Sequence, residues 1–311
     1  MNVAKQHISN TTTILKTMRL PFLSLAVFCV LLGLATAMLT QAAINWFDFG
    51  LCLIAAVAAQ IAVNTLNEYQ DFKSGLDLIT VRTPFSGGSG GLVENPAAAS
   101  AVKKLAIIAI LLTIIIGLYF VYHYSTELFP LGLLGIIIII SYTKYLNKNP
   151  WLCLFAPGVG IGLLMVLGTS FVLTGQYTIS ALSVGLICLC LINNLLLLNQ
   201  IPDAEADKHV GRNHFIIAFG TKRALMVYAL FLLLAASVLL LAGHFHFLPK
   251  LSYIALIPML AAAEAVRIIN SNVINNNVAP EPLRKGLGLN VVAVNGTPLL
   301  LAIAIIISTI H

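Results

Sequence analysis

Long runs of apolar residues, separated by short polar segments, dominate the chain from about residue 20 to its end. Each run is long enough, or nearly so, to cross the hydrocarbon core of a bilayer, which takes about 20 residues in a helix. Because backbone groups in lipid must be satisfied within their own segment, we predict that the runs are helices. The predicted spans are residues 20–41, 48–70, 101–124, 127–143, 152–174, 178–200, 223–244, 249–269 and 289–310.

Charge placement gives an orientation for these nine spans. If the N-terminus is inside, every one of the 17 lysines and arginines except Lys250 falls within or beside an inner segment. Cytoplasmic segments of membrane proteins carry such an excess of basic residues. We therefore expect an all-α integral membrane protein. We expect residues 1–311 to form one nine-helix domain in the cell membrane, with a cytoplasmic N-terminus.

Composition agrees with this interpretation. The chain is 59% hydrophobic and only 9% charged, whereas soluble domains carry roughly 25% charged residues. The net charge of +6 is explained by orientation, so no nucleic-acid partner is expected. All five cysteines lie inside apolar runs, which is typical of reduced cysteines that pack in a core.

A first polar motif, NEYQDFKSGLD (67–77), follows the second apolar run. Asn64, Asn67 and Asp71 are spaced by three and four residues, so they share one face of a helix. Gly75 is predicted to end that helix, and Asp77 follows after the turn. Glu68 lies about 100° around the helix from Asn67, off the shared face.

A second motif, NQIPDAEADKHVGRN (199–213), follows the sixth run. Asn199, Asp203 and Asp207 are spaced by four and four residues, which predicts a single stripe on one helix. Pro202 is predicted to bend the helix at this point. Both motifs lie on the predicted inner side.

These two motifs hold six of the eleven acidic residues, namely Glu68, Asp71, Asp77, Asp203, Glu205 and Asp207. Carboxylate and amide oxygens suit Mg²⁺ or Mn²⁺, and Mg²⁺ is usually held by one or two carboxylates plus substrate phosphates. Two facing acidic clusters would repel each other unless cations lay between them. A metal-bridged diphosphate site explains the pairing better than acids that are merely solvated at helix ends.

The pair is similar to the two signature motifs of the UbiA superfamily of intramembrane prenyltransferases. Residues 67–77 resemble the first signature and residues 199–207 the second, and DFKSGLD is most similar to the branch of dihydroxynaphthoate prenyltransferases, which make menaquinone precursors. RLP (19–21), SYTKYL (141–146) and the glycine-rich helix sequence at 158–177 also match. The resemblance therefore covers nearly the whole chain.

The resemblance implies an activity as well as a fold. Mg²⁺, or Mn²⁺, would hold an isoprenyl diphosphate at the cytoplasmic mouth of the bundle, with the prenyl chain in an apolar tunnel open toward lipid. Ionisation would give an allylic carbocation, which an electron-rich aromatic acceptor would attack. The metal ligands that it implies are Asn67, Asp71, Asp77, Asn199, Asp203 and Asp207, and the four aspartates are also the predicted catalytic residues.

Polar residues near the motifs are predicted to bind the substrate, because negative charge grows on a departing diphosphate. Tyr142 would hydrogen-bond the diphosphate or steady a cation, whereas Arg19 is interpreted mainly as an orientation signal. The loop RTPFSGGSGG (82–91) is predicted to be an anion nest, a lid or a plain mobile loop. The predicted substrate-binding residues are Asn64, Glu68, Lys73, Arg82, Tyr142, Lys144, Lys208 and Arg212.

Four departures from the expected pattern leave the acceptor open. Glu68 stands where the family usually has Asp, and residues 158–162 contain glycines without the Gly-Glu that is common in the menaquinone branch. After Gly211 that branch usually has a basic residue and then Thr, whereas here Arg212 is followed by Asn213, and the loop 82–91 is also unlike that branch. A terpene cyclase, or transfer to a non-aromatic acceptor, would use the same metal chemistry. An ion transporter fits less well, because the acids cluster at one face. A phosphatidyl-group transferase would carry its acids in one motif.

Overall fold

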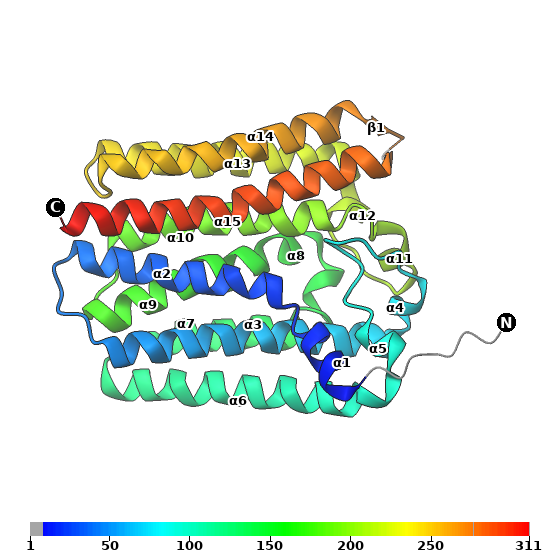
Figure 1. Ribbon diagram of the computed structural model, residues 1–311, viewed down its shortest axis with the longest axis horizontal. Helices are drawn as coiled ribbons and strands as arrows, with labels where there is room; N and C mark the ends of the chain where they lie inside the picture. The colour runs from blue at the N-terminus through cyan, green and yellow to red at the C-terminus, as the bar shows by residue number, and fades with distance from the viewer. Residues whose placement is uncertain (1–8, 276, 311) are drawn as a thin grey trace.

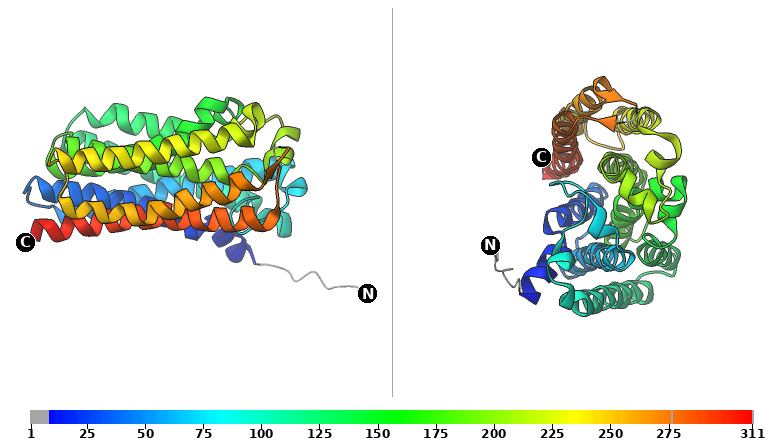
Figure 2. Two further views of the ribbon diagram at one scale, coloured as in Figure 1. Left: turned by 90° about the horizontal axis from the view of Figure 1, so that it is seen from above. Right: turned by 90° about the vertical axis from the view of Figure 1, so that its right-hand side faces the viewer.

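The computed structural model describes residues 9–275 and 277–310, and most of them are helical. Eight helical segments are long and apolar enough to cross a membrane, and they lie side by side with their axes roughly aligned (Figures 1 and 2). This makes the chain a multi-pass membrane protein. The eight segments are Asn10–Leu39, Trp46–Ser74, Pro96–His123, Pro150–Thr174, Ile179–Asn199, Thr221–His244, Lys250–Ser271 and Pro280–Ile310.

Four of these segments are single helices, and the other four are each built from two or more consecutive helical elements. The helices are α1 (Asn10–Thr17), α2 (Leu23–Leu39), α3 (Trp46–Ser74), α4 (Leu76–Ile79), α5 (Gly91–Glu94), α6 (Ala99–His123), α7 (Leu128–Ser141), α8 (Pro150–Pro157), α9 (Met165–Thr174), α10 (Ile179–Asn199), α11 (Ala204–His209), α12 (Phe215–Phe219), α13 (Thr221–His244), α14 (Leu256–Ser271) and α15 (Pro280–Ile310). Short 3₁₀ turns occupy Leu20–Phe22, Pro96–Ala98, Leu146–Lys148 and Lys250–Ala255.

The predicted span 127–143 corresponds to α7, whose 14 residues are shorter than a full crossing. Two antiparallel strands of two residues each, β1 (Val273–Ile274) and β2 (Asn277–Val278), are a small addition to the expected all-α fold. They lie at the same end of the bundle as α1, α4, α5 and α11 (Figure 1). The segments that follow both polar motifs therefore meet at one end. Lys5, which the orientation prediction counts among the inner basic residues, lies outside the described residues.

Helix α3 ends where the sequence predicted. Asn45 caps its first turn by accepting hydrogen bonds from the backbone N–H groups of Phe47 and Asp48. Gly75 ends it with φ of +80°, a left-handed conformation that glycine adopts without steric cost. The chain then reverses into α4, which carries Asp77 in its first turn.

The second motif differs from the expected single helix. Helix α10 ends at Asn199, the chain turns through residues 200–203, and α11 begins at Ala204. The predicted bend at Pro202 is thus a complete break, since proline lacks the N–H that a continuing helix requires and its ring clashes with the preceding turn. The prediction that Asn199, Asp203 and Asp207 form a stripe on one helix is wrong.

The fifth predicted span is interrupted in its middle. A π-helical segment, Gly158–Leu164, separates α8 from α9 directly after Pro157. The N–H of Gly158 donates to Oδ1 of Asn193 at 2.8 Å. A side chain at Gly158 would lie 2.3 Å from that oxygen, so glycine is required for the close approach to α10. The π-helical segment lines the cavity described below.

Helix α10 lies at the centre of the bundle, and its apolar side chains are the largest part of the main core. Polar groups also join it to its neighbours. Asn194 Nδ2 donates to the carbonyl of Tyr228 at 3.0 Å, and the Tyr228 hydroxyl donates to Asn290 Oδ1 at 2.8 Å. Hydrogen bonds of this kind link helices across apolar surroundings, and they hold α13 and α15 against α10.

Candidate functional site

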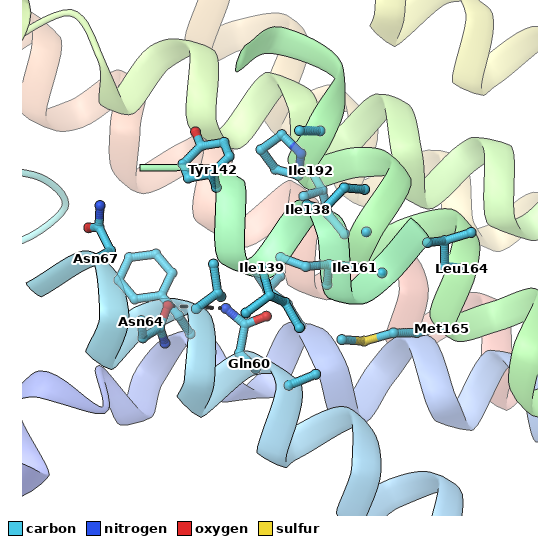
Figure 3. A pocket seen from close by; sticks show the side chains of 18 of the residues that line it. Gln60, Asn64, Asn67, Ile138, Ile139, Tyr142, Ile161, Leu164, Met165 and Ile192 are labelled. Atoms are coloured by element: carbon cyan, nitrogen blue, oxygen red, sulfur yellow. Dashed lines mark hydrogen bonds between the residues drawn. The ribbon is translucent and has the colours of Figure 1, made fainter. Parts of the chain in front are cut away.

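A cavity of about 560 Å³ lies between α3, α6, α7, the α8–α9 segment and α10. Its end near α4 and α11 is lined by carboxylates and amides, whereas the rest is lined almost entirely by apolar side chains. Figure 3 shows Gln60, Asn64 and Asn67 of α3 on one side of this pocket, with Ile138 and Ile139 opposite. The cavity can therefore hold a molecule with a charged head and a long apolar body.

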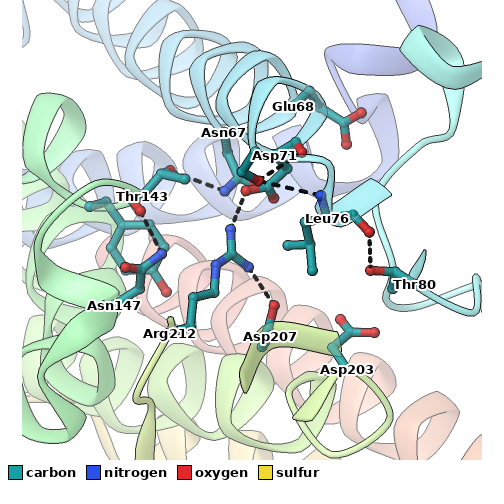
Figure 4. Close-up of polar contacts among 12 residues, drawn as sticks. Asn67, Glu68, Asp71, Leu76, Thr80, Thr143, Asn147, Asp203, Asp207 and Arg212 are labelled. Atoms are coloured by element: carbon teal, nitrogen blue, oxygen red, sulfur yellow. Dashed lines mark hydrogen bonds and ion pairs between the residues drawn. The ribbon is translucent and has the colours of Figure 1, made fainter. Parts of the chain in front are cut away.

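The first motif lines this cavity as its spacing predicted. Asn64, Asn67 and Asp71 all face it from α3, and Asp77 faces it from α4. Asn67 Nδ2 donates to Oγ1 of Thr143 at 3.0 Å, which fixes its amide toward the end of α7. Figure 4 shows Asn67 beside Asp71, with Thr143 on its other side.

Arg212 joins the two motifs. Its guanidinium lies between Asp71 and Asp207 and forms ion pairs with both (Figure 4); the Nη1 to Asp207 Oδ1 distance is 2.8 Å. Asp71 and Asp207 are both buried. Two buried carboxylates facing each other need such a counter-charge, and Arg212 supplies a positive charge to both.

Glu68 does not face the cavity as the four aspartates of the two motifs do. It is fully buried, accepts a hydrogen bond from Arg19 Nε at 2.7 Å, and also binds Ser89 through the backbone N–H and the hydroxyl at 2.8 and 2.6 Å. It is absent from the cavity lining. Glu68 thus fastens the glycine-rich loop to α3, and Arg19 balances its charge.

The loop 82–91 folds over the polar end of the cavity. The N–H of Gly87 donates to Oδ2 of Asp203 at 3.1 Å, and Gly88 lies close to Oδ1 of Asp77. Gly87, Gly88 and Gly90 all have positive φ, and a side chain at Gly87 would lie 2.9 Å from the backbone of Arg82. Glycine is therefore needed for the path that brings backbone N–H groups to the carboxylates.

Asp77 and Asp203, which lie beyond the ends of the membrane-spanning helices, have carboxyl groups with strongly raised pKa values. Burial, together with the nearby carboxylates of Glu68 and Asp71, raises the pKa of Asp77 to about 7. Burial and the neighbouring Asp207 raise the pKa of Asp203 to about 7. Accumulated negative charge in a desolvated site produces such shifts, and they mark a place where a cation would bind favourably.

The donor set fits a divalent cation. Oδ2 of Asp77, Oδ1 of Asp203 and Oδ1 of Asn199 are buried and have no hydrogen-bond partner within the described residues. No group of three or more His, Cys, Asp or Glu in that part of the chain is placed to hold a metal with protein atoms alone. Magnesium is commonly completed by water and substrate phosphate oxygens, so an open set of unpaired oxygens suits it.

The predicted cationic residues fall into two groups. Arg212 lines the cavity, as does Arg19, which the sequence suggested mainly as an orientation signal. Lys73, Lys144 and Lys208 are exposed outside the lining. Arg82 is exposed as well and donates to the carbonyl of Asp77 at 3.1 Å, so it holds the loop rather than facing the cavity.

Several polar residues of the site carry no signal in the sequence. His214 is buried, with Nε2 3.1 Å from Oδ2 of Asp207. Gln200 Nε2 donates to Cys153 Sγ at 3.2 Å, and Sγ also lies 3.6 Å from the Tyr142 hydroxyl. All of these residues and Asn147 line the polar end. The sequence thus predicts a role in the site for Tyr142, but not for the polar residues that lie beside it in the lining.

The model of the UbiA prenyltransferase family matches residues 26–275. The chain is 31% identical over 204 residues to the 1,4-dihydroxy-2-naphthoate octaprenyltransferase of Bacillus subtilis (strain 168), a match that covers 64% of this chain and 63% of the relative. It is 25% identical over 198 residues to the protein of the same name from Haemophilus influenzae, covering 60% and 62%. The match therefore spans less than two thirds of the length of either relative.

A solved structure of a UbiA homolog from Archaeoglobus fulgidus, bound to DMAPP and Mg²⁺, has the same fold. The TM-score is 0.66 at 16% sequence identity, and the match covers 94% of this chain and 99% of that one. At this identity the similarity is evidence for the fold alone.

Proposed function

The chain belongs to the UbiA prenyltransferase family, and on this premise we propose that it transfers an isoprenyl group from a prenyl diphosphate to an aromatic acceptor of the naphthoate type. The observation that carries the proposal is the junction of unpaired carboxylate and amide oxygens with a long apolar cavity. A prenyl diphosphate has the same two parts. The names of the relatives, both naphthoate octaprenyltransferases, support the choice of acceptor.

The carboxylates of Asp71, Asp77, Asp203 and Asp207 would hold Mg²⁺ (or Mn²⁺), together with the amide oxygens of Asn67 and Asn199. The bound metal would neutralise the negative charge that grows on the departing diphosphate. The cavity walls would exclude water from the allylic cation until the acceptor attacks it.

The other polar residues would bind and orient the diphosphate. Arg212 lies between the two motifs and would donate to phosphate oxygens in the bidentate manner that guanidinium groups favour. Backbone N–H groups of the loop 82–91 would add neutral donors, since Gly87 already donates to a carboxylate oxygen at this place. Asn64 would keep its position on α3, because its Nδ2 donates to the Met18 carbonyl at 2.9 Å.

Residues outside the cavity lining would act on the substrate at longer range. Lys73, Lys144 and Lys208 would attract the anionic substrate to the mouth, an effect that salt screens. Glu68 and Arg82 would keep the loop 82–91 over the site. The proposed substrate-binding role of these five residues is therefore indirect.

We also propose that the chain crosses the cell membrane nine times, with the N-terminus and the site on the cytoplasmic side. Helix α1 lies at the end that carries α11, whereas α15 ends at the opposite end (Figure 1). This arrangement calls for an odd number of crossings, and α7 would be the ninth. Basic residues gather at the α11 end, which favours a cytoplasmic location for it.

Product identification tests this function. Purified protein in detergent or vesicles would be incubated with Mg²⁺, prenyl diphosphates from dimethylallyl to octaprenyl and a panel of hydroxylated aromatic acids, with mass spectrometry as the readout. We expect a prenylated naphthoate product that requires both Mg²⁺ and the protein. Diphosphate release with a cyclised hydrocarbon, and no aromatic adduct, would contradict the proposal and favour the cyclase alternative.

A further inference from the structure

The apolar part of the cavity extends far from the carboxylates. On α3 the lining runs from Asn67 at the polar end to Cys52, fifteen positions earlier, which is about 22 Å along a helix. The lining at this far end comes from the last turns of α6 and from the first turns of α7. A prenyl chain that starts at the diphosphate site would therefore reach these turns once it contains several isoprene units.

This far end is open at the surface of the bundle. Leu118 of α6 and Phe129 and Leu133 of α7 line the cavity, yet their exposed fractions are 52%, 50% and 48%. A residue that lines a cavity and is also half exposed marks an opening. Because α6 and α7 lie within the bilayer, the opening faces lipid.

Two glycines stand at this opening. Gly117 of α6 and Gly132 of α7 both line the cavity, and a methyl group at either would meet no other atom within 4 Å. Neither has a positive φ. By contrast, side chains at Gly158 and Gly162 would collide with α10 at less than 3 Å. Packing and backbone conformation thus require glycine at 158 and 162, but not at 117 or 132.

We infer that Gly117 and Gly132 determine which prenyl chain lengths the protein accepts, by keeping the far end of the cavity open so that a long chain passes out between α6 and α7 into lipid. The inference rests on the proposed use of a prenyl diphosphate. A larger side chain at either position closes the exit without disturbing the helix backbone. It leaves the polar end, about fifteen positions away along α3, unchanged.

Binding of unreactive analogues tests this directly. The probes are geranyl and octaprenyl thiolodiphosphates, whose bridging sulfur resists ionisation, added with Mg²⁺ to the full-length protein. For Gly117→Leu and Gly132→Leu we expect the ratio of octaprenyl to geranyl affinity to fall at least about tenfold, since even one methylene displaced from an apolar pocket changes selectivity by that order. Gly50→Leu is the matched control, because Gly50 also has open space around it but lies outside the cavity lining; its ratio should equal that of the parent.

Each outcome decides the question. An unchanged ratio in both leucine variants overturns the inference, as does an equal change in Gly50→Leu. A variant that binds neither analogue is replaced by the alanine variant at the same position, whose ratio must shift in the same direction. If the analogues bind with the expected ratios but no aromatic acceptor is prenylated, the transferase proposal fails and the chain-length inference stands. If the parent protein binds neither analogue, both fail.

Discussion

The backbone N–H of Gly87 donates a hydrogen bond to Oδ2 of Asp203 at 3.1 Å, across 116 positions of the chain. This contact attaches the glycine-rich loop, which follows the first motif, to the second motif. The loop thereby forms part of the wall of the cavity at its polar end, where residues 85–88 line it. Its position follows from the left-handed conformation of Gly87.

The first prediction concerns this loop. Gly87→Ala should destabilise the protein by about 1–3 kcal/mol, because alanine at positive φ is strained, and its methyl group would also collide with the Arg82 backbone. We expect faster proteolysis within residues 82–91 and weaker binding of prenyl diphosphate. Limited proteolysis and a binding titration measure the two effects.

Gly175→Ala is the control for backbone strain alone. Gly175 has a similar φ of +75°, with no atom near an added methyl group, and it follows α9 at the opposite end of the bundle. Its alanine variant should lose stability without losing affinity for the diphosphate. Equal losses of affinity in the two variants would show that the loop has no special role.

A second prediction separates Arg212 from the exposed lysines. Arg212→Gln removes the only group that pairs with both Asp71 and Asp207 among the described residues. We expect turnover to fall by about 10²-fold or more, the scale reported for the loss of one preorganised donor, at low and high salt alike. Arg212→Lys should recover little, since an ammonium group cannot form two directed pairs at once.

Lys208→Gln provides the comparison on the neighbouring helix α11. Because Lys208 is exposed and lies outside the cavity lining, its loss should lower the apparent affinity only by a small factor, which disappears at high salt. Steady-state kinetics at two salt concentrations measure both variants. A salt-independent loss in Lys208→Gln equal to that of Arg212→Gln would contradict this assignment.

A third prediction concerns pH. The pKa of Asp77 is raised to about 7, well above its value in an unfolded chain of about 4. The folded protein therefore holds a proton that the unfolded chain releases, and this carboxyl destabilises the metal-free protein increasingly as pH rises from about 4 to about 7. Asp77→Asn should stabilise the metal-free protein near pH 8, by on the order of 1 kcal/mol per unit of raised pKa.

The stabilisation should shrink as the pH is lowered toward about 4, where the carboxyl is protonated in both states. Thermal unfolding in detergent with a chelator, over a series of pH values, measures it. Glu205→Gln serves as the control, since Glu205 is exposed on α11 and should show no such pH dependence. An Asp77→Asn variant that is less stable than the parent near pH 8 would contradict the conclusion that the buried Asp77 carboxylate destabilises the metal-free protein.

The sequence predicted the first motif better than the second, for a physical reason. Asn64, Asn67 and Asp71 lie on one uninterrupted helix, so their spacing translates directly into a shared face. In the second motif Pro202 breaks the helix, and periodicity no longer applies beyond Asn199. Asp203 and Asp207 nevertheless line the cavity, because the turn and α11 fold back over it.

Other features depended on contacts between distant segments. Helix geometry alone predicts that Glu68 lies off the shared face, but its partners Arg19 and Ser89 are 49 and 21 positions away, and no local pattern identifies them. His214 and Gln200 are single polar residues beside helix ends, where such residues are common. The shape of the cavity, including the opening at Gly117, depends on how α6 and α7 pack and is absent from any local sequence pattern.

The central claim is that the two motifs together bind one magnesium–prenyl diphosphate complex. Asp71→Asn and Asp203→Asn change one carboxylate of each motif to an amide of nearly equal size. We expect either change to lower magnesium-dependent transfer by about 10²-fold or more. The double variant should be little worse than either single one, because groups that act as a unit have non-additive effects.

The most direct measurement is therefore the rate of prenyl transfer by the parent, the two single variants and the double variant, with Mg²⁺ and with a chelator. The account predicts that transfer requires Mg²⁺, collapses in each single variant and falls little further in the double variant. Normal turnover in both Asp71→Asn and Asp203→Asn would contradict it.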